Sequence, residues 1–438
     1  MPIVTNRFTG SSLDRGFGDD GEQDEGGSGR RKRKPQYSGG LVLEPKRGFY
    51  DKFILLLDFN SLYPSIIQEY NICFTTIKHW LLPPGKIADV PEAGTVQGIL
   101  PKVMFRLLER RRGVKKLLKA EKNVIAEKRT QLDIRQKALK LVANSMYGCL
   151  GFGSSRFYCE PLAALITSQG RDVLARSVEL TNTMGYNVIY GDTDSIMVNT
   201  NEDDLKRVVP IGQNIKQAVN KRFKILEIDI DGIYRNMLLL RKKKYAARKI
   251  EQLPNGQSTW TREVKGLDLV RRDWCPLSKD IGSFVLEQIL TGNAREEVVE
   301  SIHARLIQLR EDLKQNKVEL EKFIITKGLT KNPKDYADSK GQPHVAVALR
   351  MISQVRWLLS SCPQGKTAKV GDYIPYIICE GDVPASQRAY HPNDVKTGAG
   401  SLSVDVKWYL ESQVLPPVAR LCGPIEETTP AMIAECLG

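Results

Sequence analysis

The chain has 438 residues, of which 41% are hydrophobic and 26% charged, and its formal net charge is +14 at pH 7. These proportions are typical of a globular protein with two or three domains, and no uninterrupted apolar run is longer than Phe53–Leu57, which is far too short to span a bilayer. They exclude a protein held in a membrane by helical spans and favour a polyanionic partner. The eight cysteines form no C-x-x-C pair, so neither a zinc module nor a disulfide framework is indicated.

Residues 1–36 differ in composition from the rest of the chain. They are rich in glycine, serine and acidic residues, and they include the basic run Arg30–Lys34. That composition predicts a disordered leader. The basic run is a candidate nuclear import signal or nucleic-acid contact, and a solvated linker explains it equally well.

Apolar periodicity predicts the first elements after this leader. Phe53–Leu57 predicts a buried strand that presents Asp58 at its end. Residues 80–100 have the prolines and glycines of a loop. Further along the chain, helical patterns cover residues 161–184 and 278–322.

Residues 101–148 predict two antiparallel helices with a break near Lys122-Asn123 and an end at Gly148. Residues 101–140 hold fourteen Lys or Arg against four Asp or Glu. On the second helix, the spacing i, i+3, i+7, i+10 places four side chains on one face: Lys137, Lys140, Asn144 and Tyr147. Lysines suit the phosphates of a nucleoside triphosphate, and Arg110–Arg112 on the first helix could face the same cleft. A solvated basic helix explains this stretch alone equally well.

Three aspartates stand at positions where strands end or turn. Tyr186–Tyr190 and Ser195–Asn199 predict a hairpin whose tight corner carries Asp192 and Asp194, and Asp58 ends the earlier strand. Clustered carboxylates repel each other, and divalent cations relieve that repulsion, with Mg²⁺ the usual ion where phosphates also bind. The aspartates therefore predict a two-Mg²⁺ site for phosphoryl transfer. A D-x-D pair on its own is more often a simple turn.

Three strings in chain order resemble motifs of family B DNA polymerases. They are DFNSLYPSII at residues 58–67, KLVANSMYG at 140–148 and YGDTDS at 190–195. The likeness continues through Lys242–Tyr245 and Lys265–Asp268, and it runs from about residue 37 to the end of the chain. It implies an α+β fold shaped like a right hand, with an antiparallel-sheet palm, helical-hairpin fingers and a mostly helical thumb. The implied domains are palm 37–94 and 149–274, fingers 95–148 and thumb 275–438.

The resemblance also implies roles for individual residues. Asp58 and Asp194 would ligate both metal ions together with the carbonyl of Phe59, and Asp192 would support them near the primer end. Nucleotide-binding residues would be Ser61, Leu62, Tyr63, Arg111, Lys140, Asn144 and Tyr147. Among these, Tyr63 would pack under the deoxyribose and block a 2′-hydroxyl. Nucleic-acid contacts would be Lys243, Tyr245, Lys327 and Lys331.

The longer sequence context is similar to the branch of the family that works beside a primase. It implies a nuclear enzyme that binds a DNA template, an RNA or DNA primer and deoxynucleoside triphosphates, with primase and accessory replication subunits as partners and no membrane. Family members carry further domains ahead of the matched region, so we expect a portion of a larger protein. The alternative is an inactive nucleic-acid-binding remnant. A third reading is an enzyme that makes RNA or copies it into DNA with the same metal chemistry, and the large side chain of Tyr63 argues against the use of ribonucleotides.

Overall fold

A computed structural model describes residues 37–83, 85–120, 126–252, 258–358, 368–397, 402–425 and 428–438. The expected disordered leader and the expected break near Lys122-Asn123 lie outside these residues. The described residues belong to one compact unit. Among them, no helix is both long enough and apolar enough to cross a membrane.

The larger sheet is antiparallel throughout and consists of seven strands in the described residues. Its order is β3 (Asn187–Asp192), β4 (Ser195–Asn199), β2 (Ile54–Phe59), β5 (Ile228–Arg241), β6 (Lys244–Gln252) and β7 (Ser258–Lys265), while β1 (Gly48–Tyr50) also pairs with β5. The predicted buried strand and the predicted hairpin are confirmed as β2 and as β3–β4. The α+β class with an antiparallel sheet is therefore what the structure shows.

Helices pack on one face of this sheet, and that packing decides which way Asp58 points. Side chains at Leu55 and Leu57 of β2 join a core with α1 (Leu62–Glu69), α4 (Glu160–Thr183) and α5 (Leu205–Asn220). Ile54 and Leu56 face the other way, into a smaller cluster. Because side chains alternate along a strand, Asp58 shares the face of Leu56, opposite the helices.

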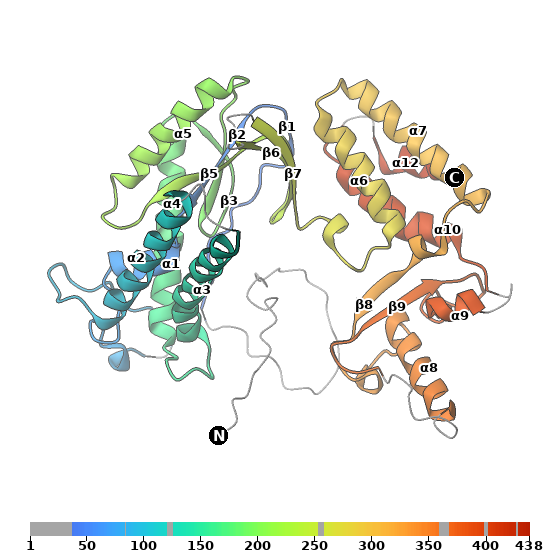
Figure 1. The fold of residues 1–438 in the computed structure, drawn as a ribbon, viewed down its shortest axis with the longest axis horizontal. Coiled ribbons are helices and arrows are strands. Elements are labelled where there is room, and N and C mark those ends of the chain that lie inside the picture. Colours follow the sequence, from blue (N-terminus) through green and yellow to red (C-terminus); the bar gives the residue numbers. More distant parts are fainter. Residues whose placement is uncertain are drawn as a thin grey trace. The chain divides into compact units, whose positions relative to one another are not determined.

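Two long helices lie side by side next to α1 (Figure 1): α2 (Ile99–Ala120) and α3 (Ala126–Gly151). The predicted pair is confirmed, but the expected end at Gly148 is wrong. A glycine ends a helix when it adopts a left-handed conformation, and Gly148 is not among the residues with positive φ. By contrast, Gly185 has φ 86° just after α4, so the predicted helix over 161–184 ends as expected.

The C-terminal part of the chain packs around a second large hydrophobic core, which Leu238 of β5 and Ala246 of β6 also join. The helical run predicted over 278–322 is divided by Gly292, whose left-handed φ of 82° ends α6 (Pro276–Thr291) before α7 (Arg295–Lys314) begins. A three-stranded antiparallel sheet follows, in the order β10 (Ala389–Tyr390), β9 (Tyr373–Ile378), β8 (Ile325–Gly328). The other helices here are α8 (Pro343–Leu358), α9 (Pro392–Thr397), α10 (Val406–Tyr409), α11 (Leu415–Cys422) and α12 (Pro430–Leu437). Short 3₁₀ or π turns occur at His79–Leu81, Asp268–Val270, Leu320–Phe323, Pro333–Asp335 and Leu410–Val414.

Candidate functional site

Asp58 and Asp194 come together where two neighbouring strands meet. Asp58 lies near the end of β2, and Asp194 lies in the turn that enters β4, its partner strand. The amide of Phe59, next to Asp58, donates a 2.8 Å hydrogen bond to the carbonyl of Asp194. This bond ties the hairpin turn to the strand end, so the backbone holds the two carboxylates close to each other.

The carboxyl of Asp58 is poised to exchange a proton near neutral pH. Burial is the largest cause that raises its pKa to about 7, and the negative charges of Asp194 and Asp231 act in the same direction. Burial and then Asp192 also raise the pKa of Asp194. The ammonium of Lys140 lowers the pKa of both Asp58 and Asp194, which places this predicted phosphate-binding residue beside the pair.

Asp192 differs from the other two aspartates because the protein itself compensates its charge. The ammonium of Lys243, on the turn between β5 and β6, donates to both carboxylate oxygens of Asp192, at 2.8 and 2.9 Å. The hydroxyls of Thr193 and Tyr190 donate to the same carboxylate, at 3.0 and 3.3 Å. The amide of Lys243 also donates to the Tyr190 hydroxyl at 2.9 Å.

The carboxylates fit Mg²⁺ as a pair rather than as a threefold cluster. In the residues that the structure describes, no group of three or more His, Cys, Asp or Glu is arranged to hold a metal ion. Mg²⁺ in phosphate-handling sites is commonly held by one or two carboxylates and completes its shell with water and substrate phosphates. Asp58 and Asp194, which repel each other and are half buried, match that donor set.

A small basic cavity lies at the start of α1, where its lining begins two residues after Asp58. Its volume is about 190 Å³, and it is lined by Asn60, Ser61, Ser65, Leu108, Arg111, Arg112, Lys115 and Glu227. Arg111 donates to the Ser61 hydroxyl at 3.1 Å, while its buried Nε has no hydrogen-bond partner. Ser61 adopts a left-handed φ of 53° at the N-cap of α1. A buried guanidinium beside a helix N-terminus is suited to bind an anion, since both present N–H donors and positive charge.

Of the four side chains predicted to line one face of α3, only some make contacts at the site. Tyr147 stacks on Tyr63, with 4.4 Å between ring centroids and 30° between ring planes. Lys140 and Asn144 are exposed, and Lys137 forms an ion pair of 2.6 Å with Asp133 on its own helix. The structure therefore brings Tyr63, Tyr147, Lys140 and Arg111 to the site. Arg110, the alternative to Arg111, is exposed.

Tyr63 sits in a narrow space between helices and the chain segment before β1. Gly170 of α4 makes room for its ring, because a Cβ there would lie 3.2 Å from Tyr63 Cε1. Burial is the main cause that raises the pKa of Tyr63 to about 12, followed by the charge of Asp194. The ring is thus neutral at physiological pH and lies near the carboxylate of Asp194.

Sequence reasoning missed the segment Tyr37–Leu43, which runs past this tyrosine, and it also missed Arg171 and Asp231. Tyr37 hydrogen-bonds Tyr147, and Arg171 donates to two carbonyls of the segment, those of Ser38 and Gly39. The only signal in the sequence is an aromatic residue followed closely by two glycines. This short stretch has no apolar periodicity, so it predicts a turn and no contact with the site.

The remaining predicted residues lie elsewhere. Tyr245 is buried in the cluster on the helix-free face of the sheet, so its ring does not reach the surface. Lys327 and Lys331 are exposed, on β8 and on the loop after it. Burial, followed by the charge of Lys327, lowers the pKa of His344 to about 4.

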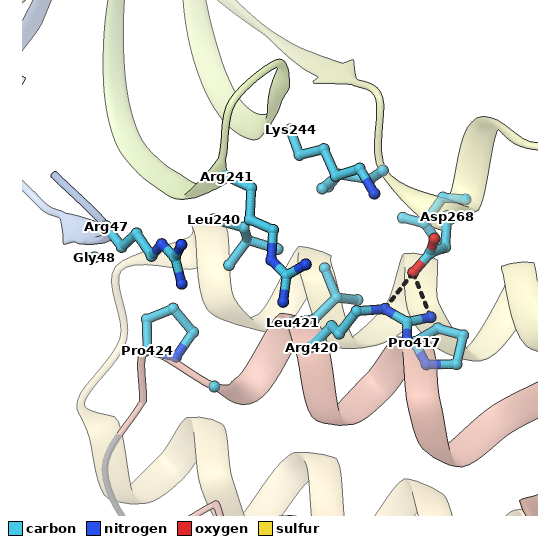
Figure 2. Close-up of a pocket in the computed structure, with 13 residues that line it drawn as sticks. Arg47, Gly48, Leu240, Arg241, Lys244, Asp268, Pro417, Arg420, Leu421 and Pro424 are labelled. Carbon is cyan, nitrogen blue, oxygen red and sulfur yellow. Dashed lines mark hydrogen bonds and ion pairs between the residues drawn. The ribbon is translucent and has the colours of Figure 1, made fainter. Parts of the chain in front are cut away.

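A larger basic pocket opens next to the turn that carries Lys243. Figure 2 shows Arg47, Arg241, Lys244 and Arg420 around this pocket of about 430 Å³. Asp268 is the one acidic residue in its wall, and Arg420 already binds it at 2.7 Å. Because Arg420 neutralises Asp268, the other three cations give this pocket a positive surface that attracts phosphate groups.

Comparisons with known proteins identify the family of the chain. The model of DNA polymerase family B matches residues 19–425. The chain is 51% identical over 418 residues to the DNA polymerase alpha catalytic subunit of Oryza sativa subsp. japonica, covering 94% of this chain and 26% of that protein. It is 50% identical to the subunit of the same name from Xenopus laevis, with 93% and 28% covered, and 47% identical to that of Mus musculus, with 96% and 29% covered. The chain thus spans less than a third of the length of these relatives.

Proposed function

The chain belongs to DNA polymerase family B, and we propose that it is the core of a template-directed DNA polymerase that adds deoxynucleoside triphosphates to a primer 3′ end by two-metal phosphoryl transfer. The observation that carries this proposal is the approach of Asp58 and Asp194 at adjacent strands, with raised pKa values, beside Lys140 and Arg111. An inactive remnant would have no need to keep two mutually repelling carboxylates half buried.

The domains of this proposal follow the described elements. The antiparallel sheet with α4 and α5 would be the palm, residues 37–94 and 149–274. The helical pair α2–α3 would be the fingers, residues 95–148, and the helices and small sheet of residues 275–438 would be the thumb. Most buried residues of the C-terminal core follow residue 274, which supports the last boundary, and Leu238, Ala246 and Leu267 join that core from the other side.

Each side chain of the site has a task in this reaction. Asp58 and Asp194, with the Phe59 carbonyl, would hold the two Mg²⁺ ions, which supply Lewis acidity when bound. Arg111, Lys140 and the Ser61 and Leu62 amides would neutralise and orient the triphosphate. Tyr63 and Tyr147 would enclose the deoxyribose, Asn144 would line the nucleotide pocket, and Asp192 with Lys243 would face the primer end.

The partners in this proposal come from the relatives, which are named DNA polymerase alpha catalytic subunits. We propose a nuclear enzyme that extends RNA as well as DNA primers and works with primase and accessory replication subunits. Lys327 and Lys331 would contact the primer–template duplex from the thumb. Tyr245 would act through the backbone it anchors, because its ring is buried.

A primer-extension assay tests the proposed activity. The purified chain is given one template with either an RNA or a DNA primer, and deoxynucleotide addition is measured with Mg²⁺ and with EDTA. We expect extension of both primers, only with Mg²⁺. Binding without extension under every condition would leave the inactive-remnant reading, and extension of the DNA primer alone would remove the proposed RNA-primer role.

The raised pKa of Asp58 predicts that Mg²⁺ binding depends on pH. The pKa rises from 3.8 to about 7, so at pH 6 the carboxyl is mostly protonated and at pH 8 it is mostly ionised. Since a carboxylate must be deprotonated to bind metal, we expect the apparent Kd for Mg²⁺ to be about tenfold weaker at pH 6 than at pH 8. Titration of Mg²⁺ against the thermal unfolding midpoint measures it. The Asp58→Asn variant should bind Mg²⁺ weakly at both pH values. An equal affinity of the unchanged chain for Mg²⁺ at pH 6 and at pH 8 would contradict the prediction.

The basic pocket in Figure 2 predicts how salt affects duplex binding. Each neutralised phosphate releases condensed counterions, so the double substitution Arg241→Gln and Lys244→Gln should reduce the slope of log K against log salt by about 2. Fluorescence anisotropy of a labelled primer–template between low and moderate salt gives the slope. The matched control is Lys221→Gln with Arg222→Gln, two exposed cations just after α5. The same slope in both double variants would show that the pocket does not contact the duplex.

A further inference from the structure

The segment Tyr37–Leu43, here called the strap, is bound at one end to the turn that carries Asp192. Leu43 donates its amide to the Gly191 carbonyl at 2.9 Å, and the Leu41 carbonyl accepts a 2.8 Å hydrogen bond from the amide of Thr193. Val42 forms an isolated antiparallel bridge with Asp192. The strap therefore extends the sheet by a short stretch and fixes the backbone on both sides of Asp192.

The other end of the strap is bound to the helices that carry the tyrosine stack. The Tyr37 side chain hydrogen-bonds Tyr147, the ring that stacks on Tyr63. The Tyr37 hydroxyl also lies against Gly151, where a Cβ would overlap it. Any shift of Tyr37 would therefore be felt at the C-terminal end of α3.

Arg171 of α4 holds the middle of the strap from the side. Its Nη1 donates to the carbonyl of Ser38 at 2.9 Å and to the carbonyl of Gly39 at 2.7 Å. Its charge also opposes the burial that raises the pKa values of Tyr63 and Tyr147, so this guanidinium lies near both rings. One side chain thus contacts the strap backbone and lies near the stack.

Gly40 is the point at which the strap touches both parts of the site. A Cβ at this position would lie 2.8 Å from Cγ2 and Oγ1 of Thr193 and 3.1 Å from the hydroxyl oxygen of Tyr63. At the preceding residue, Gly39, a Cβ would meet nothing within 4 Å. Only one of the two adjacent glycines is thus required by close packing.

We propose that the strap is a positioning element that sets the Tyr63–Tyr147 stack against the Asp192–Thr193 turn, so that Gly40 and Arg171 determine how strictly the enzyme selects deoxyribose over ribose. The inference rests on the proposed function, because it assumes that Tyr63 faces the sugar. The strap acts through geometry alone: its backbone keeps the ring of Tyr63 at a fixed distance from the Asp192–Thr193 turn, and none of its groups reacts. Gly40 and Arg171 are therefore positioning residues.

The adjacent glycines provide a matched pair of variants. Gly40→Ala must push Thr193 and the Tyr63 hydroxyl aside, and displacements of this kind near reacting groups cost about tenfold or more in rate. We expect kcat for deoxynucleotide insertion to fall about tenfold and discrimination against ribonucleotides to fall with it, while KM changes little. Gly39→Ala should leave both quantities unchanged. Single-nucleotide insertion with a deoxyribonucleotide and with its ribonucleotide counterpart measures them.

Helix α4 provides a second matched pair. Arg171→Met removes the clamp on the strap, and Arg176→Met makes the same change at an exposed arginine whose partner is Asp172 on the same helix. Discrimination against ribonucleotides should fall in the Arg171→Met variant and stay unchanged in the Arg176→Met variant. Arg171→Lys, which keeps one donor and the charge, should recover part of the loss.

Hydrogen exchange tests the strap without any need for catalysis. The Thr193 amide, which donates to Leu41, should exchange faster in Gly40→Ala than in Gly39→Ala, read by mass spectrometry on the fragment covering β3 and β4. Faster exchange together with lost discrimination supports the proposal. Equal exchange and equal discrimination in the two glycine variants would overturn it. If the unchanged chain inserts no nucleotide, the proposed function fails, and the exchange comparison still decides whether the strap holds the turn.

Discussion

Replacing Asp58 or Asp194 with asparagine is expected to lower the rate of nucleotide addition by about 1,000-fold or more, while affinity for a primer–template stays nearly unchanged. Asparagine keeps the size of the side chain and removes its negative charge. The loss falls on the chemical step, because these carboxylates lie at the strand ends beside the proposed phosphate-binding residues rather than on the duplex surface. Rapid-quench insertion and an equilibrium binding titration separate the two effects.

A control for these variants is Asp203→Asn. Asp203 is an exposed carboxylate that forms ion pairs with Lys52 and Arg235, away from the paired aspartates. The Asp203→Asn variant should insert nucleotides at the rate of the unchanged chain. Retention of a substantial part of that rate by Asp58→Asn or Asp194→Asn would show that the paired carboxylates do not serve as metal ligands.

Tyr63→Ala is expected to relax sugar selection by about 100-fold, through faster ribonucleotide insertion more than through slower deoxyribonucleotide insertion. The ring of Tyr63 is held between Tyr147, Gly170 and Gly40, so it cannot move aside for a 2′-hydroxyl without disturbing α3, α4 or the strap. Removing the ring opens that space. The ratio of kcat/KM for the two nucleotide types gives the selectivity.

The matched variant is Tyr63→Phe, which keeps the ring and removes only the hydroxyl. If exclusion is steric and the ring provides it, Tyr63→Phe should discriminate nearly as well as the unchanged chain. A selectivity in Tyr63→Ala equal to that of the unchanged chain would assign sugar choice to another residue.

Local sequence patterns predicted the elements that carry the carboxylates. The apolar run before Asp58 and the tight corner at Asp192–Asp194 gave β2 and the β3–β4 hairpin, because strand burial and turn chemistry act over a few residues. Helix ends were less predictable. Gly148 lies within α3, while Gly292 divides a run that the pattern treated as continuous, since the effect of a glycine depends on the φ that its surroundings impose.

Contacts between distant residues could not be read from the sequence. Asp192 and Lys243 are 51 residues apart, and in the sheet three strands, β4, β2 and β5, lie between the strand of Asp192 and β6, so neither chain distance nor strand order predicts their contact. The sequence pattern alone does not distinguish Asp192 from the other two aspartates, because it does not show that Lys243 is the counter-ion of Asp192. Arg171 is 133 and 132 residues away from Ser38 and Gly39 of the strap, and its contacts go to backbone carbonyls, which any sequence would provide.

The ammonium of Lys243 has consequences for the order in which ligands bind. It is engaged with both oxygens of Asp192, and its residue adopts a left-handed φ of 61° at the hairpin turn. Any primer phosphate that binds Lys243 must compete with Asp192, and success leaves the turn one unit more negative beside Asp58 and Asp194. By thermodynamic linkage, a primer that releases Asp192 in this way strengthens cation binding, and bound cations strengthen primer binding by the same factor. In the proposed reaction, Lys243 would thus couple the binding of the primer to the binding of the metal ions.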